Sequence, residues 1–526
     1  MIKIGYVEKE KVKRRTIEPY QASNSFSRFA VNIFSNIVGM GLNIVVGIWL
    51  TPYLLQHLGV ASFGVVALAL SASYYTRVIS NSLNLAVGRY LTVDLHRNLF
   101  NVANSTFNTA FWSSIGISLL LLPLILALAI ATPRFFDVPA GQEAATQVLF
   151  AMVMIAYLIG IIQGVFTTPT FSLSRFDLQN AITASNLLVR VFVIFLLFNF
   201  FQANMIYVGI GELLGGITCL IFAYFTWRSL TPELKISIGY FDKSRLFELS
   251  RISIWVLINE VGALLLMNID LVIISIFLGA TTAGLYGSIL QWPLLLRVLA
   301  GTVSGVLTPL LISYYAHDDL DTITHLLHQA VKLLGLAMAL PIGLIWGFAE
   351  PLLNLWLGPE FVQLAMLTRI QTIHLCVNLA VLPLFSVQVT LNKVRWPAII
   401  TLITGVAKLF LAIAWVNWGS NGLGVALAGA IILTLKNFFF TSLYVAHIQK
   451  LPWNAFLNSM IPVILATAGV GGVSYVISQI YILNSWFSVI GIGSAISATY
   501  MIFVYFMGLN PDNRKLLWSL LPGQTR

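Results

Sequence analysis

Charged residues are scarce in this chain of 526 residues, of which only 9% are Asp, Glu, Lys or Arg. Water-soluble domains average roughly 25% charged residues. Hydrophobic residues make up 58% of the sequence, so there are too few polar side chains to cover an aqueous surface. The composition therefore excludes a soluble globular protein and indicates that lipid surrounds most of the chain.

Cysteine and the common catalytic motifs are also rare or missing. The two cysteines, Cys219 and Cys376, each lie inside an apolar run, which excludes a disulfide framework. The sequence has no G-x-x-x-x-G-K-[ST] loop, no H-E-x-x-H motif and no Cys-x-x-Cys pair. These absences exclude P-loop nucleotide hydrolysis and the zinc sites that such motifs build. We expect no enzymatic activity, no cofactor and no metal site.

Positive charge exceeds negative charge, with 29 Lys and Arg against 19 Asp and Glu and a net charge of +10. The basic residues form no single patch and are not interleaved with aromatics, so they do not indicate nucleic-acid binding. The first apolar run begins near residue 29, too far along for a cleaved signal peptide. Residues 1–28 are therefore expected to form a cytosolic tail.

Long hydrophobic runs are what the sequence has in abundance. Each is about long enough to cross a hydrocarbon layer roughly 30 Å thick. The runs cover residues 29–55, 63–84, 106–131, 147–168, 179–200, 204–227, 252–277, 284–310, 330–349, 364–390, 397–416, 421–444, 458–480 and 486–508. The sequence therefore predicts an all-α polytopic membrane protein with about 14 transmembrane helices.

The orientation follows from basic residues in the connecting segments, because cytosolic loops are enriched in Lys and Arg. If the N-terminus is cytosolic and the runs alternate, 22 basic residues fall on the cytosolic side. Only Arg134 falls on the opposite side. Both termini are therefore predicted to be cytosolic.

An internal repeat divides the chain into two halves. HLGVASFG at 57–64 resembles FLGATTAG at 277–284, an offset of 220 that also relates Arg77 to Arg297. An offset of 218 places Arg190 over Lys408. Each repeat has six predicted spans, so both halves enter the membrane in the same direction and form a parallel pair. The expected units are a first bundle at 29–227, a cytosolic linker at 228–251, a second bundle at 252–444, two extra helices at 458–508 and a cytosolic tail at 509–526.

Ionisable residues inside the spans are the candidate functional residues, since each costs about 2.5–3.5 kcal/mol to insert and seldom faces lipid. By repeat symmetry, four bases are predicted to line a central cavity and bind an anionic substrate: Arg77, Arg190, Arg297 and Lys408. The alternative is that these bases form salt bridges with intramembrane acids. Coupling-ion or counter-ion roles are considered for Asp270, Glu260, Glu212 and Lys436.

Several segments resemble a known transporter family. NIFSNIVGMGLNIVVGIWLTPYLLQHLGVASFG at 32–64 resembles the first helix and turn of polysaccharide-biosynthesis, O-antigen-type oligosaccharide flippases. ALLLMNIDLVIISIFLG at 263–279 is similar to their seventh helix, with Asn268 and Asp270 in an N-x-D context, and PLLNLWLGPEF at 351–361 to a later loop. These flippases belong to the multidrug/oligosaccharidyl-lipid/polysaccharide exporter superfamily, and the resemblance spans roughly residues 25–510.

The resemblance implies a transporter that flips a polyprenyl-diphosphate-linked oligosaccharide across the bacterial inner membrane by alternating access. The cargo would serve lipopolysaccharide O-antigen, capsule or exopolysaccharide assembly. A cation-lined lumen would suit the diphosphate. The expected partners are the lipid-linked oligosaccharide, membrane lipids, and a polysaccharide polymerase with its chain-length machinery, and the expected state is a monomer.

Three other functions stay open. A lipid II-type flippase would also have two extra helices. An ion-coupled exporter of small organic cations should have an acidic and aromatic pocket, whereas six bases and three acids lie inside the spans here. A membrane glycan polymerase or ligase would need a long outer loop. The longest expected outer loops, near 132–146 and 350–363, are too short to build such a site.

Overall fold

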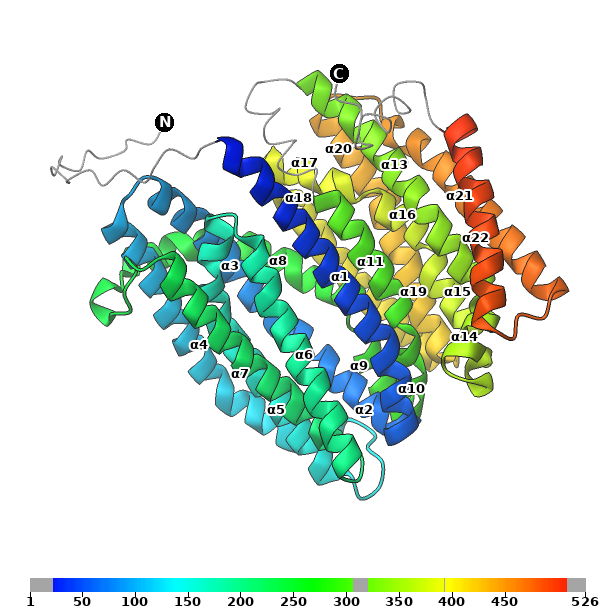
Figure 1. Ribbon diagram of the computed structural model, residues 1–526, viewed down its shortest axis with the longest axis horizontal. Helices are drawn as coiled ribbons and strands as arrows, with labels where there is room; N and C mark the ends of the chain where they lie inside the picture. Colours follow the sequence, from blue (N-terminus) through cyan, green and yellow to red (C-terminus); the bar gives the residue numbers. More distant parts are fainter. Residues whose placement is uncertain (1–21, 306–319, 392, 509–526) are drawn as a thin grey trace.

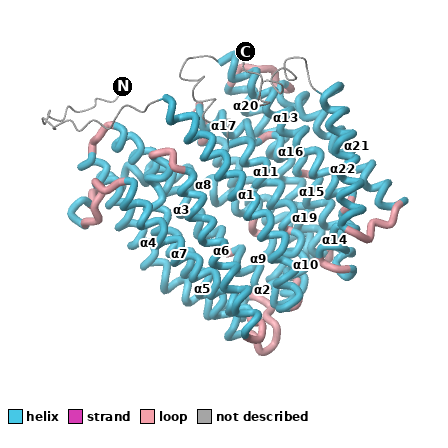
Figure 2. Tube along the Cα trace, in the orientation of Figure 1, coloured by secondary structure: helices cyan, strands magenta, loops and turns pink. Residues whose placement is uncertain are grey.

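The computed structural model describes residues 22–305, 320–391 and 393–508, and every regular element in these ranges is a helix (Figures 1 and 2). Twelve helical segments of the described chain are long and apolar enough to cross a membrane, or thirteen if the bent helix α8 counts. The predicted run 63–84 falls on two helices that meet at Ala72, and the first of them is a short apolar helix. The all-α membrane fold is confirmed, whereas the total of 14 spans stays a prediction.

The first bundle consists of seven helices, because its second predicted span is divided between two of them. They are α1 (Ala22–Leu58), α2 (Val60–Ser71), α3 (Ser73–His96), α4 (Phe100–Phe135), α5 (Glu143–Ser172), α6 (Phe176–Phe200) and α7 (Met205–Leu230). In Figure 1, α3 to α7 stand together, and α1 lies along the boundary with the second bundle.

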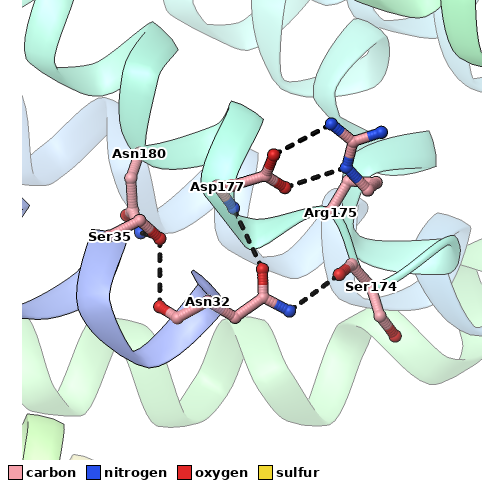
Figure 3. A network of polar contacts seen from close by, with 6 residues as sticks. All are labelled: Asn32, Ser35, Ser174, Arg175, Asp177 and Asn180. Atoms are coloured by element: carbon pink, nitrogen blue, oxygen red, sulfur yellow. Dashed lines mark hydrogen bonds and ion pairs between the residues drawn. The ribbon is translucent and has the colours of Figure 1, made fainter. Parts of the chain in front are cut away.

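A polar network fastens the beginning of α1 to the turn between α5 and α6 (Figure 3). The Asn32 amide donates to the carbonyl of Ser174 at 2.9 Å and accepts from the backbone N–H of Asp177 at 3.2 Å. Asn180 donates to the Ser35 hydroxyl at 3.0 Å. These bonds satisfy backbone groups at the start of α6 that no helix can satisfy itself, so α1 is fixed to the first bundle.

The second bundle has more breaks than its hydropathy indicates. Its helices are α8 (Lys243–Met267), α9 (Asp270–Phe277), α10 (Gly279–Ile289), α11 (Gln291–Gly305), α13 (Leu320–Gly347), α14 (Ala349–Trp356), α15 (Ala365–Ile373), α16 (Leu375–Ala380), α17 (Leu382–Thr390), α18 (Arg395–Asn417), α19 (Asn421–Leu435), the π-helix η3 (Lys436–Thr441) and α20 (Ser442–Ile448). Gly279, the first residue of α10, follows the break after α9 and has φ of +82°, a conformation that favours glycine because it has no Cβ.

The two extra helices, α21 (Ala455–Ile480) and α22 (Trp486–Phe503), attach to the second bundle through α13. Gly343 of α13 lets α21 approach closely, because a Cβ there would lie 2.7 Å from the Cβ of Val470. The hydroxyl of Tyr500 on α22 donates to the carbonyl of Leu336 at 2.7 Å. Figure 1 accordingly shows both helices on one side of the molecule.

The connection between the bundles is held against α4 by two asparagines. Asn104 donates to the carbonyl of Glu233 at 3.1 Å and accepts from the N–H of Lys235 at 2.8 Å. One helical turn later, Asn108 donates to the carbonyl of Lys235 at 2.7 Å and accepts from Ser237 at 2.8 Å. Alternate linker residues are thus bonded as in an extended strand, so the linker is ordered along the first bundle.

Helix α8 begins at Lys243, inside the stretch that we assigned to the linker from the sequence. Asp242 caps it, since its carboxylate accepts the N–H and the hydroxyl of Ser244, both at 2.8 Å. These hydrogen bonds favour the charged form and lower the pKa of Asp242. The helix bends by 45° between Ser250 and Ile254.

The two bundles touch through residues that the repeat relates. Gly64 of α2 lies against the carbonyl oxygen of Ala280, and Gly284 of α10 lies against that of Val60. A Cβ at either glycine would overlap the oxygen, so only glycine permits the contact. Residues i and j that contact each other reciprocally mark a two-fold interface. The pseudo-two-fold axis of the repeat therefore passes between α2 and α10.

Candidate substrate cavity between the bundles

A cavity of about 340 Å³ lies between the two bundles. Its wall comes from α1, α2, α5, α6 and α7 of the first bundle and from α8 to α11 of the second. Apolar side chains form most of the lining, and its polar members include Asn43, Arg190, Glu212, Asp270 and Arg297. A cavity between two related halves is a common place for a transported molecule, and we call this one the central cavity.

The wall from the first bundle carries an ion pair between α6 and α7. Arg190 Nη1 lies 2.6 Å from Glu212 Oε1. The helices approach closely because α7 has glycines here, and a Cβ at Gly211 would lie 3.1 Å from the carbonyl oxygen of Arg190. Within the described residues, Arg190 Nε is buried and has no hydrogen-bond partner. Glu212 therefore uses part of the guanidinium, and the N–H of Nε has no acceptor among the described residues.

The wall from the second bundle carries a deeper polar chain through four helices. Lys408 of α18, only 1% exposed, donates to the carboxylate of Asp270 and to the carbonyl of Leu266 at 2.7 Å. The hydroxyl of Tyr286 donates to the other oxygen of Asp270 at 2.8 Å and accepts from Gln371. Because Asp270 is also the first residue of α9, the positive end of that helix favours its negative charge.

Several charged side chains on the cavity wall thus form ion pairs with basic or acidic neighbours. Two of the arginines that the structure describes line it: Arg190 is paired with Glu212, and Arg297 enters from α11 of the second bundle. Asp270 is already held by Lys408 and Tyr286. Both lining carboxylates therefore have basic partners, and a negatively charged ligand would meet arginines from both halves.

Contacts beside the cavity join the bundles. The indole N–H of Trp356 in α14 donates to the carbonyl of Ile48 in α1 at 2.7 Å. Gln291 of α11 packs against Gly47 of α1, where a Cβ would overlap the amide. Together with the contact between α2 and α10, these contacts hold the two bundles together next to the cavity.

Comparison with known proteins decides the family. A family model described as polysaccharide biosynthesis protein matches residues 29–315. The membrane protein EpsK of Bacillus subtilis strain 168 is 32% identical over 491 residues, which cover 93% of this chain and 97% of that protein. The chain belongs to the polysaccharide biosynthesis protein family.

Solved structures with the same fold are transporters. The lipid II flippase MurJ in an inward closed conformation has a TM-score of 0.60 at 15% identity, covering 94% of this chain and all 100% of that structure. An inward-facing multidrug resistance MATE transporter has a TM-score of 0.60 at 14% identity, covering 80% of this chain and 99% of that structure. These neighbours show that this polysaccharide biosynthesis protein has the same membrane fold as the lipid II flippase MurJ and the MATE transporter.

The predicted site residues of this family member fall in different places. Arg190, Arg297, Glu212 and Asp270 line the central cavity, whereas Lys408 lies behind Asp270. The side chain of Arg77 lies outside the described residues. The two remaining candidates, Glu260 on α8 and Lys436 in the second bundle, are not part of the lining.

Several uncharged polar residues at the site were not found from the sequence. Asn43, Gln291 and Tyr157 line the central cavity, Tyr286 donates to Asp270, and Gln371 donates to Tyr286. A polar side chain within a long apolar run could have indicated a cavity-lining position. Many such side chains, however, only form hydrogen bonds to the backbone of their own helix. Within the described residues, no group of three or more His, Cys, Asp or Glu side chains could hold a metal ion.

Proposed function

We propose that the protein flips a polyprenyl-diphosphate-linked oligosaccharide across the bacterial inner membrane by alternating access, for assembly of a surface polysaccharide. The observation that carries the proposal is the central cavity, to which both halves of the repeat contribute an arginine. Guanidinium groups suit phosphate oxygens because they present several N–H donors in a planar fork. The family match to polysaccharide biosynthesis proteins supports the same substrate class.

Two other cargoes fit less well. A pocket for small organic cations needs free carboxylates, but Glu212 and Asp270 are both held by bases. A lipid II-type cargo shares the diphosphate and would use the same arginines, so the attached glycan distinguishes it. The neighbouring lipid II flippase covers more of this chain than the MATE transporter does, 94% against 80%, but at 15% identity it indicates the fold alone.

The proposed orientation has both termini in the cytosol. Figure 1 places the beginning of α1 and the end of α22 at the same end of the molecule, with the α4–α5 and α6–α7 turns at the other, which supports it. The proposed monomer would meet the polysaccharide polymerase and its chain-length machinery at the outer face, where the flipped cargo arrives.

The test uses cells that lack this chain. Their polyprenyl-linked glycans should accumulate as complete, untransferred lipid-linked oligosaccharide, with loss of the surface polymer. Mass spectrometry of the pool would identify the glycan. Re-expressed R297Q should restore less than about a tenth of the flux, since a charge-assisted contact contributes about 1.5–3 kcal/mol. An unchanged glycolipid pool in the deleted cells would refute the proposed cargo.

A further inference from the structure

Lys436 is a buried base that the central cavity does not explain. It begins the π-helix η3 in the second bundle, is only 8% exposed and is not part of the cavity lining. Its Nζ lies 5.2 Å from the centre of the Phe385 ring in α17. In the described part of the chain, this ring is the one partner of the ammonium group. By contrast, Arg190 and Lys408 each have a carboxylate.

A second donor without a partner lies on the same helix as that ring. Gln388 follows Phe385 by three residues in α17, so the two side chains leave the same face, about 5–6 Å apart at Cβ. Gln388 is 3% exposed, and its Nε2 has no hydrogen-bond partner among the described residues. Its neighbours Leu384 and Val387 belong to an apolar cluster, which cannot satisfy it.

The backbone at Lys436 is also unusual. Residues Lys436–Thr441 form a π-helix within an otherwise α-helical span. Single π-helical turns are rare and are frequent at functional sites, because they shift the direction of the side chains that follow. This feature is independent of the missing partners and marks the same position.

The chemistry of the two groups selects the ligand. An ammonium and a primary amide both donate hydrogen bonds, and burying either without an acceptor is unfavourable. No described carboxylate pairs with Lys436, so a metal cation or an organic cation would be repelled. A negatively charged group with several oxygen acceptors would satisfy both donors, and phosphate-type oxyanions are the common case in a membrane.

We propose that Lys436 and Gln388 form a second anion subsite, inside the second bundle and apart from the central cavity, that binds a phosphate-type oxyanion. The subsite does not depend on the cargo proposed for the central cavity. Its phosphate can belong to a lipid head group or to a soluble anion, since both present the same oxygens.

The test is a calorimetric titration of the purified full chain in detergent with inorganic pyrophosphate. It is made in an R297Q background, which removes an arginine of the central cavity. We expect R297Q to retain binding, and R297Q/K436Q to bind at least about tenfold more weakly. K436R should restore the affinity because it keeps the charge. K332Q is the matched control, since Lys332 is a partly buried lysine of α13 in the same bundle.

A conservative variant keeps the test decisive if K436Q misfolds. Q388L retains the lysine and the volume but removes the amide donor, so its affinity should fall by a few-fold. Equal affinities for R297Q, R297Q/K436Q and R297Q/Q388L would overturn the subsite, and so would an equal loss in K332Q. With the loss confirmed, competition by vesicles of phosphatidylglycerol would assign the site to a lipid phosphate, and its absence to a soluble anion.

Discussion

Buried ion pairs allow this chain to keep charged side chains within lipid. Asp270 has three partners, because Lys408, Tyr286 and the N-terminal end of α9 all favour its negative charge. Lys408 in turn has Asp270 and the carbonyl of Leu266. Neither charge is left alone, so the pair is stable only as a unit.

Removing one member of this pair should therefore cost more than removing both. K408M leaves the Asp270 carboxylate buried without a base, which is expected to destabilise the protein by about 3–5 kcal/mol. In D270N/K408M no uncompensated charge remains, so much of the loss should be recovered. Thermal unfolding of the purified variants in one detergent measures both effects. If the loss of stability in D270N/K408M equals the sum of the losses in K408M and D270N, the two groups do not interact.

The sequence revealed which residues are charged inside the membrane but not their partners. Arg190 and Glu212 lie on consecutive helices, so an ion pair between them could be expected from the sequence. Asp270 and Lys408 are separated by 138 residues, and hydropathy does not say which helix faces which. The proposed pairs of Arg77 with Arg297 and of Arg190 with Lys408 came from repeat symmetry, which relates positions in two bundles without placing them in contact.

At the scale of elements, the long hydrophobic runs predicted where helices exist and missed where they break. The runs at 364–390 and 284–310 read as continuous spans, yet the first is divided into α15, α16 and α17. Such breaks depend on packing and on polar residues such as His374, which local hydropathy averages away. The repeat was more informative, because the matched glycines Gly64 and Gly284 lie where the two bundles meet.

The linker between the bundles is held by side chains of α4, which can be tested directly. N104L/N108L removes four hydrogen bonds to the backbone of residues 233–237. The extended segment should then separate from α4, and trypsin should cleave after Lys235 several-fold faster in the native protein. N458L, on an exposed position of α21, is the matched control. Equal cleavage rates in all three proteins would mean that these bonds do not order the linker.

At the scale of the whole molecule, the two bundles meet at α2 and α10, at α1 and α11, and at α3 and α8, and the central cavity lies between them. The contacts at α2 and α10 are reciprocal, as Gly64 meets Ala280 and Gly284 meets Val60. A cargo that enters from one side of the membrane can leave from the other only if the closed side opens. The alternating access that we propose would therefore require α2 and α10 to separate in each transport cycle.

A covalent bond across this axis should stop transport, whereas one within a bundle should not. A Cβ at Gly287 would lie 3.0 Å from that of Ala67, its repeat partner on the other bundle. Disulfides span about 3.5–4.5 Å between Cβ atoms, so A67C/G287C should cross-link after a slight adjustment. The control A156C/G216C joins α5 and α7 within the first bundle, with the corresponding atoms 3.5 Å apart.

Both cysteine pairs are introduced into a variant in which Cys219 and Cys376 are replaced by serine. The amount of accumulated lipid-linked glycan then measures the transport flux. Oxidation should block A67C/G287C and spare A156C/G216C, and reduction should restore the first, because only the first bond prevents the bundles from separating. If oxidised A67C/G287C transports as well as its reduced form, the bundles do not separate at α2 and α10. The cargo would then have to pass through one bundle, and arginines from both halves would not be needed to bind it.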